Sequence, residues 1–257
     1  FVIYDAGDQA SLARQVLREI RVHDAQLRPR DMLSIVSRWK GLGIRPDEAV
    51  QLADNDREHL AAVGYRRYQD ALKRSGGMDF DDLLLLTDEL LQNHPEVRLA
   101  EQQRFDHILI DEYQDTNQIQ YRIIKALAEV HRNICVVGDD DQAIYGFRGS
   151  DVRHILAFPA DWKGAVTVRL EENYRSTQAI IEVANQLIRC NPDRHPKVLH
   201  ASGGKGSRPR IEQHRDESDE ARWVVGDIRR ATSSPDTDFS DVAVLFRTNE
   251  QPRIFET

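Results

Sequence analysis

The chain has 257 residues, of which 40% are hydrophobic and 30% charged, and its formal net charge is -8. This length suits one large or two modest domains with cores of their own, and two is the better expectation. The composition is that of a soluble globular protein, and no apolar run approaches the length of a bilayer span, which argues against membrane insertion. The negative charge argues against sequence-blind attraction to phosphate backbones, because that attraction needs clustered lysine and arginine.

The start of the chain and its two cysteines bear on the cellular location of the protein. The chain opens on Phe1, and the residues that follow lack the basic start and the apolar stretch of a secretion signal, so we expect the natural protein to begin earlier. Cys135 lies in an apolar run and Cys190 beside an expected helix end. Two cysteines so placed form neither a disulfide framework nor a zinc site, which fits a reducing, cytoplasmic location.

Local basic groups remain as candidates for contact with nucleic acid. They are Arg66 with Arg67, Lys73 with Arg74, and the loop from Lys197 to Arg210. Each is alternatively a solvated face, which is the more common role of such groups.

The first third of the chain has a helical pattern from Asp8 to about Gly77. Four apolar residues recur at the spacing of one helix face, before a stop at Gly41 and Gly43: Met32, Ile35, Val36 and Trp39. A further helix is predicted from Asp56 to Arg74, with Gly76 and Gly77 past its end. Its apolar face consists of Ala61, Tyr65, Tyr68 and Leu72. These patterns predict a small helical subdomain.

Strands are predicted after the next helix. Asp79 is the expected N-cap of an apolar helix that runs through Leu83 to Leu91 and ends before Pro95. Four short apolar runs rich in branched residues follow: Ile108–Ile110, Ile134–Val137, Val166–Val168 and Val242–Phe246. Such runs are suited to strands that are buried on both faces.

Two further helical stripes lie among these runs. The first is Ile180, Val183, Ala184, Leu187 and Ile188, and the second is Ala221, Val224, Val225 and Ile228. Strands that alternate with helices imply parallel sheets with right-handed crossovers. The expected fold class is therefore α/β.

Parallel sheets bind ligands beyond the carboxyl ends of their strands, so the residues after each apolar run are the candidates for a site. Asp111 and Glu112 directly follow Ile110. Magnesium prefers one or two carboxylates together with waters and phosphates, which suits Asp111. Glu112 would then orient and deprotonate a water for attack on a terminal phosphate. An acidic loop that caps the next helix would contain the same pair, so the pair alone leaves both interpretations open.

The segment Gly138–Gly149 follows the second apolar run. Gly138 permits a sharp exit from the strand, and Gln142 offers an amide that could sense a phosphate or hold the attacking water. Tyr145 and Phe147 could stack on unpaired bases, worth roughly 1–3 kcal/mol per base, and Arg148 could hold a phosphate or brace the rings. Alternatively, both aromatic residues are ordinary core anchors.

The third apolar run leads into Glu171–Thr177, where Ser176 is an expected N-cap. Tyr174 and Arg175 are adjacent there. An aromatic ring that stacks on a nucleobase, beside an arginine that meets the transferring phosphate, makes a compact nucleotide site, and such arginines contribute roughly 10³–10⁵ in rate. A surface salt bridge is the alternative role for Arg175.

Together these segments resemble the UvrD/Rep/PcrA-type helicases of superfamily one, which share a DEYQDTN box, a GDxxQxIYxFRG box and an NYRS box. The chain has them in that order, at Asp111–Asn117, Gly138–Gly149 and Asn173–Ser176. Met78–Leu84 and Val242–Glu256 also look like family segments. The resemblance implies RecA-like parallel-sheet motor domains, both incomplete in this chain, with an inserted all-helical subdomain. It implies that residues 1–77 are the helical accessory subdomain, 78–165 the C-terminal part of the first motor domain, and 166–257 the N-terminal part of the second.

The resemblance also implies a role for each site residue: Asp111 for magnesium, Glu112 for water activation, Gln142 for the terminal phosphate, Tyr174 for stacking on adenine, and Arg175 as the arginine finger. Tyr145, Phe147 and Arg148 would face single-stranded DNA. The implied activity is ATP-driven 3′-to-5′ translocation on DNA with strand separation. Its cofactors would be ATP and Mg²⁺, and its partners single-stranded or partly duplex DNA together with proteins of DNA repair or replication.

The phosphate-binding loop of such motors, GxxxxGK followed by Ser or Thr, is absent from the sequence. Gly203–Ser207 fails as a substitute, because Gly follows its lysine and no expected strand precedes it. The later family motifs are also not reached before Thr257. We therefore expect this chain alone neither to hydrolyse ATP at a useful rate nor to unwind DNA.

Two other hypotheses remain. The chain could be a noncatalytic nucleic-acid or protein interaction module in which the carboxylates are relics. It could also be a metal-dependent nuclease that uses Asp111, Asp115 and the run Asp139–Asp141, although the NYRS box has no role in such an enzyme.

Overall fold

The computed structural model describes residues 1–256, so the last residue of the predicted range 166–257 lies outside it. Contacts divide the chain into two units: Phe1–Leu170 with Ile188–Val198, and Glu171–Leu187 with Leu199–Thr257. In the described part of the chain helices predominate, and the strands form three two-stranded parallel sheets. The fold is therefore mixed α/β, as predicted. None of the helices in residues 1–256 combines the length and the apolar character that a membrane span requires.

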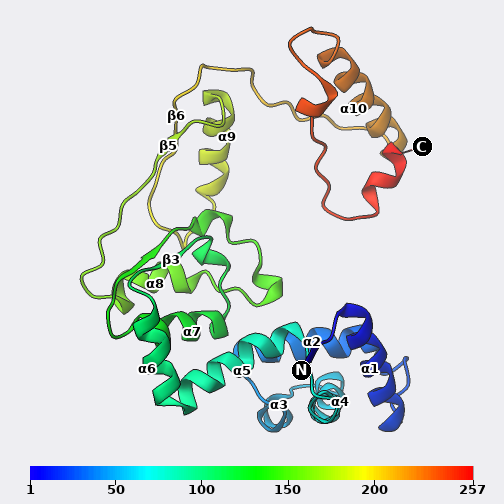
Figure 1. The fold of residues 1–257 in the computed structure, drawn as a ribbon. Coiled ribbons are helices and arrows are strands. Elements are labelled where there is room, and N and C mark those ends of the chain that lie inside the picture. Colours follow the sequence, from blue (N-terminus) through cyan, green and yellow to red (C-terminus); the bar gives the residue numbers. More distant parts are fainter. Residues whose placement is uncertain (257) are drawn as a thin grey trace. The chain divides into compact units, whose positions relative to one another are not determined.

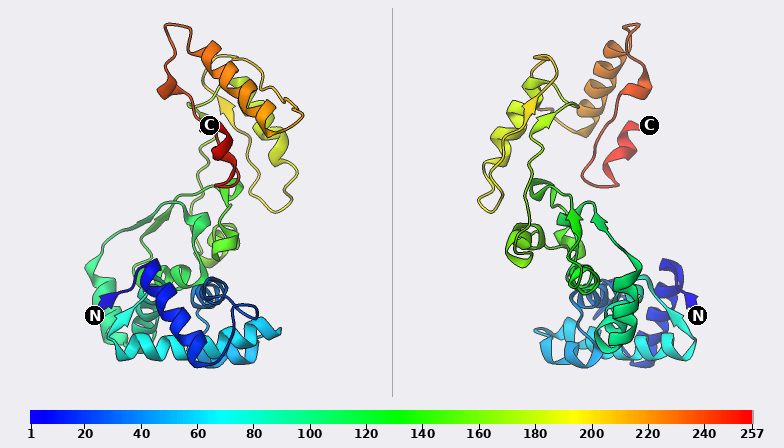
Figure 2. Two further views of the ribbon diagram at one scale, coloured as in Figure 1. Left: turned by 90° about the vertical axis from the view of Figure 1, so that its right-hand side faces the viewer. Right: turned by 60° about the vertical axis from the view of Figure 1, so that its left-hand side comes forward.

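Four helices open the first unit: α1 (Ala6–Glu19), α2 (Pro29–Leu42), α3 (Pro46–Leu52) and α4 (Asp56–Arg74). They lie together in all views (Figures 1 and 2). The prediction for α4 is confirmed at both ends: Asn55 accepts the N–H of Glu58, and Gly76 follows the helix with a φ of 64°. Helix α2 ends at Leu42, and the left-handed residue beyond it is Gly43, with a φ of 80°.

The main core lies among these four helices. Its buried apolar side chains include Met32, Val36, Trp39, Ala61, Tyr65, Tyr68 and Leu72, as the periodicity predicts, whereas Ile35 is only partly buried. A parallel pair of two-residue strands, β1 (Val2–Ile3) and β2 (Gly77–Met78), joins the two ends of the helical region. No sequence pattern predicts this pair, because two residues are too few for any alternation.

Helix α5 connects helices α1 to α4 with the rest of the first unit. As predicted, Asp79 caps α5 (Phe80–Asn93), accepting the N–H of Asp82 at 2.8 Å. The helix packs against α2 at one end and against α6 (Pro95–Arg104) and α7 (Gln118–Ala128) at the other (Figure 1).

The strands β3 (Ile108–Ile110) and β4 (Ile134–Val136) are parallel, with α7 between them in the chain and Ile108 opposite Ile134. The prediction of a parallel pair here is confirmed. The prediction that both faces are buried is wrong, because Leu109 is 75% exposed and Cys135 is also exposed. These two residues point to a face of the sheet that no helix of the first unit covers.

The other two predicted strands are wrong. Within residues 1–256, neither Val166–Val168 nor Val242–Phe246 forms a strand, and Val166 is 87% exposed. A branched apolar run becomes a strand only where a neighbouring strand pairs with its N–H and C=O groups, and no described segment pairs with either run.

The second unit contains β5 (Glu172–Asn173) and β6 (His200–Ala201), which pair in parallel, and the helices α9 (Gln178–Ile188) and α10 (Glu217–Ala231). Both helices were predicted, but the apolar stripe of α9 is not a core face. Ile180, Val183 and Leu187 are exposed, whereas Ala179 and Ile181 are buried. The pattern identified the helix correctly and its packed side wrongly.

Candidate functional site

The first candidate segment starts where β3 ends. Asp111 and Glu112 are both exposed, and one carboxylate oxygen of Asp111 accepts the N–H of Glu112 at 2.9 Å. Glu112 has a φ of 50°, in the left-handed region that costs a non-glycine residue roughly 1–2 kcal/mol. A residue held in this conformation by its surroundings is a common feature of functional sites. The backbone at Glu112 thus turns sharply out of the strand.

The carboxylate pair does not cap the next helix. Asn117 is the N-cap of α7, and its side chain accepts the N–H of Gln120 at 2.9 Å, while Gln120 returns a bond to the N–H of Asn117. The interpretation of Asp111 and Glu112 as a helix cap is therefore wrong. Their exposed side chains lie at the carboxyl end of β3.

A chain of hydrogen bonds joins Glu112 to the segment after β4. The buried Gln114 donates to the Glu112 carboxylate at 2.7 Å and accepts the N–H of Asp139 at 3.0 Å. The Asp139 carboxylate in turn accepts from the Gln142 side-chain amide at 2.7 Å. The structure thus brings Glu112 and Gln142 into one network. Sequence reasoning missed the linking roles of Gln114 and Asp139, although a glutamine between two acidic site residues was a usable signal.

Gly138 makes this approach of the two segments feasible. A Cβ atom at this position would lie 2.5 Å from the Gln114 side-chain oxygen and 2.8 Å from the Ile155 side chain. We predict that Gly138→Ala lowers the free energy of unfolding by about 1–3 kcal/mol, because the added methyl group overpacks the site. Chemical denaturation of the variant measures this loss.

Gly146→Ala is the matched control, since a Cβ there would meet no atom within 4 Å. Equal denaturation midpoints for the Gly138 and Gly146 variants would contradict the proposed close approach.

Asp115 lies beside this network in the short 3-10 helix η1 (Tyr113–Asp115). Burial, and then the negative charge of Glu112, raise the pKa of its carboxyl group. One of its oxygens is buried and has no hydrogen-bond partner among the described residues. Asp115 is thus a poor substitute for Asp111 as an open carboxylate ligand.

The acidic run Asp139–Asp141 forms ion pairs with two basic residues of the chain itself. Its three carboxylates gather within 4.8 Å of one another, but Lys197 and Arg194 pair with them. This arrangement argues against the nuclease hypothesis, which needs these carboxylates for metal. Because of these ion pairs, Lys197 is not a free basic group for contact with nucleic acid. The same holds for Arg66, which forms an ion pair with Asp47.

The aromatic residues of this segment are on the surface. Phe147 is 76% exposed, Tyr145 is exposed, and their ring centroids are 6.1 Å apart. The guanidinium carbon of Arg148 lies 5.3 Å from the Tyr145 centroid and 5.5 Å from that of Phe147. The interpretation of these rings as core anchors is therefore wrong. Arg148 braces both rings.

The NYRS segment lies in the second unit. Tyr174 is 78% exposed and donates its hydroxyl hydrogen to Glu172 at 2.7 Å, which raises the pKa of Tyr174. The Asn173 side chain accepts the N–H groups of Arg175 (3.0 Å) and Ser176 (2.8 Å). Since α9 begins at Gln178, the prediction of Ser176 as its N-cap is wrong, and Asn173 fixes the turn instead.

The side chain of Arg175 makes no ion pair within residues 1–256, so the structure does not support the surface salt bridge considered for it. Asp111, Glu112 and Gln142 belong to the first unit, and Tyr174 and Arg175 to the second.

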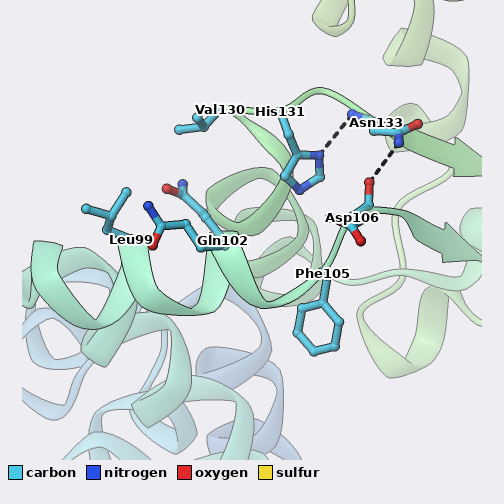
Figure 3. A pocket seen from close by; sticks show the side chains of 8 residues that line it. Leu99, Gln102, Phe105, Asp106, Val130, His131 and Asn133 are labelled. Carbon is cyan, nitrogen blue, oxygen red and sulfur yellow. Dashed lines mark hydrogen bonds between the residues drawn. The ribbon is translucent and has the colours of Figure 1, made fainter.

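A pocket of about 320 Å³ lies at the other end of the β3–β4 sheet (Figure 3). Its lining residues are Leu99, Gln102, Gln103, Phe105, Asp106, Val130, His131 and Asn133. Asn133 donates to the backbone oxygen of Asp106 at 2.7 Å, just before the two strands begin. The pocket therefore lies at the amino ends of the strands and includes none of the candidate residues.

Comparison with sequence models of known families identifies the family of the chain. The sequence model of the UvrD/REP helicase N-terminal domain matches residues 1–163, and that of the UvrD-like helicase C-terminal domain matches residues 168–257. The chain belongs to the UvrD/REP helicase family, which confirms the resemblance of its three boxes.

Similar proteins include the ATP-dependent DNA helicase PcrA of Leuconostoc citreum, which is 41% identical over 256 residues, covering 100% of this chain and 34% of that protein. The ATP-dependent DNA helicases PcrA of Staphylococcus epidermidis and Staphylococcus aureus are 39% and 38% identical over 256 residues, which again cover 100% of this chain and 35% of each relative. The chain spans about a third of the length of the curated relatives it matches.

Proposed function

We propose that this chain is part of an ATP-dependent 3′-to-5′ DNA helicase in which ATP hydrolysis drives movement along single-stranded DNA. The hydrogen-bonded chain Glu112–Gln114–Asp139–Gln142 is the observation that supports this function most directly. It fixes a carboxylate and an amide together at the carboxyl ends of two parallel strands, where such sheets bind ligands. Positioning of this kind accounts for most of the catalysis of phosphoryl transfer.

Glu112 orients the attacking water and takes up its proton, and Gln142 contacts the terminal phosphate. Asp111 fits a magnesium site, because its carboxylate is exposed and, among residues 1–256, only one of its oxygens is engaged, by the N–H of Glu112. When bound, Mg²⁺ supplies charge neutralisation at the phosphates.

Two residues of the second unit also have proposed roles in nucleotide binding. Tyr174 presents an exposed ring for stacking on adenine. Arg175 presents to the transferring phosphate a guanidinium that has no ion-pair partner within residues 1–256. The Asn173 side chain holds the backbone of this turn.

Single-stranded DNA binds at the aromatic segment of the first unit. Tyr145 and Phe147 offer exposed ring faces for base stacking, and Arg148 adds a positive charge beside them. In this proposal residues 78–165 are the C-terminal part of the first RecA-like motor domain, and residues 166–257 are the N-terminal part of the second. Residues 1–77 are the helical accessory subdomain.

The test is ATP hydrolysis by the full-length protein that carries this sequence, with and without single-stranded DNA. We expect DNA-stimulated turnover, and we expect Glu112→Gln to lower kcat roughly 10²–10⁴-fold, because it removes the general base. Glutamine has the same size as glutamate and the same tolerance of the left-handed backbone, so the change leaves the fold intact.

Glu129→Gln is the control, since Glu129 is exposed at the end of α7 and should leave kcat unchanged. Absence of DNA-stimulated hydrolysis in the wild-type protein would support a noncatalytic interaction module instead. Full activity of the Glu112 variant would refute the assigned role of Glu112.

A further inference from the structure

An ion-pair cluster that includes none of the proposed nucleotide-binding or DNA-binding residues holds the segment after β4. The Lys197 ammonium nitrogen lies 2.9 Å from the Asp139 carboxylate, 2.6 Å from that of Asp140 and 3.0 Å from that of Asp141. One cation from the chain thus lies where the three carboxylates converge. We call Arg194, Lys197 and Asp139–Asp141 the clamp.

Arg194 completes the clamp. Its guanidinium donates two hydrogen bonds to Asp141, at 2.7 and 2.6 Å, and the backbone N–H of His195 donates to Asp140 at 2.8 Å. The side chains of Arg194 and Lys197 are largely buried, at 14% and 16% exposure. Sheltered, bidentate pairs of this kind fix geometry more firmly than exposed pairs, which contribute little.

Asp139 links the clamp to the proposed catalytic residues. One of its carboxylate oxygens accepts from Lys197 and from the N–H of Asp141, and the other accepts from the Gln142 amide. Its own N–H donates to Gln114, which holds Glu112. Burial alone would raise the pKa of Asp139, but the bonds from Lys197 and Gln142 outweigh it and lower the pKa. The carboxylate therefore stays charged in this position.

The two clamp cations lie in a segment that belongs to a different unit from the chain on either side of it. The segment Ile188–Val198 belongs to the first unit, although the chain on both sides of it, in α9 and β6, belongs to the second. Residues 194 and 197, which fix the loop after β4, therefore lie in a stretch of chain whose flanking segments on both sides belong to the second unit.

We infer that Lys197 and Arg194 are positioning residues for ATP hydrolysis: they hold Asp139–Asp141 so that Asp139 orients Gln142 directly and Glu112 through Gln114. This inference rests on the proposed function. Neither cation needs to contact nucleotide or DNA, because each acts through carboxylates that it already binds.

The experiment is Lys197→Met in the full-length protein, with steady-state ATP hydrolysis measured at saturating single-stranded DNA. We expect kcat to fall roughly 10–100-fold, the scale of a displacement of about 1 Å in catalytic groups. The KM for ATP should change by less than about threefold, since the substitution replaces none of the residues proposed to contact ATP. Lys197→Arg, which keeps a cation, should recover part of the lost kcat.

Arg222→Met is the matched control, because it removes an exposed ion pair, with Asp219 at 3.6 Å, that is remote in sequence from the clamp. Its kcat should equal that of the wild type. Thermal unfolding is recorded for each variant, and if Lys197→Met fails to fold, Arg194→Gln takes its place with the same expectation.

A double-mutant cycle separates positioning from general loss of structure. Asp139→Asn removes the charge through which Lys197 acts, so the double variant Asp139→Asn/Lys197→Met should have a kcat within about twofold of Asp139→Asn alone. Fully multiplicative losses would overturn the inference, as would an unchanged kcat in Lys197→Met while the wild type is active. A wild type without DNA-stimulated hydrolysis would instead overturn the proposed function, and this inference with it.

Discussion

Replacing Lys40 by methionine is expected to lower the free energy of unfolding by about 3–5 kcal/mol. The Lys40 ammonium nitrogen is buried, 2.7 Å from a carboxylate oxygen of Asp79 and 2.8 Å from one of Asp82. Methionine has a similar length but leaves two buried carboxylates without their cation. Leaving a buried charge unpaired costs more than the pair itself contributes.

The loss of stability should be large because the carboxylates of Asp79 and Asp82 also make other contacts. Asp79 and Asp82 form the capping box of α5, and Tyr68 donates to Asp79 at 3.1 Å. Burial, and then the charge of Asp79, raise the pKa of Tyr68, so the phenol remains a donor. Gln69 donates to Asp82 at 3.0 Å. Loss of Lys40 thus weakens the contact of α2 and α4 with the start of α5.

Urea denaturation followed by far-ultraviolet circular dichroism measures this loss. Lys73→Met is the control, since Lys73 is exposed in α4 and should change stability by less than about 0.5 kcal/mol. A triple variant, Lys40→Met with Asp79→Asn and Asp82→Asn, should regain part of the stability because the two carboxylates that lost their cation are then neutral. Equal midpoints for the Lys40 and Lys73 variants would contradict the role of the buried network.

The helical region was predictable because its information is local. Helix α4 has an apolar face, an asparagine cap and terminal glycines, and both of its ends were correct. The strand predictions used apolar runs, which indicate a surface that can be buried but not the neighbour that buries it. Ile108–Ile110 and Ile134–Val136 pair with each other, whereas Val166–Val168 and Val242–Phe246 have no paired strand among the described residues.

The site shows the same division between local and tertiary information. Glu112 and Gln142 were predicted as candidates because each lies soon after a predicted strand. Gln114 and Asp139 acquire their roles only when the two segments meet. Lys197 was predicted as a candidate contact for nucleic acid. Its actual partners are the three carboxylates of Asp139–Asp141, which lie far from Lys197 in the sequence, so the local charge pattern does not reveal them.

Arg175→Ala is expected to lower the kcat of DNA-stimulated ATP hydrolysis roughly 10³–10⁵-fold in the full-length protein. An arginine that meets the transferring phosphate stabilises charge that develops only in the transition state, so its loss should fall on kcat rather than on the KM for ATP. The structure suits this role, because the turn that carries Arg175 is held by Asn173 while the guanidinium has no carboxylate partner among residues 1–256.

Arg229→Ala is the control for Arg175, since Arg229 is exposed in the last turn of α10 and should leave kcat unchanged. Arg175→Lys separates charge from geometry: it keeps the positive charge but loses the planar pair of donors, so it should recover only a small part of the rate. If Arg175→Ala kept more than about a tenth of the wild-type kcat, an effect far below that of known arginine fingers, the second unit would not act on the transferring phosphate through this residue. Glu112 and Gln142 in the first unit would then have to stabilise the transition state without it.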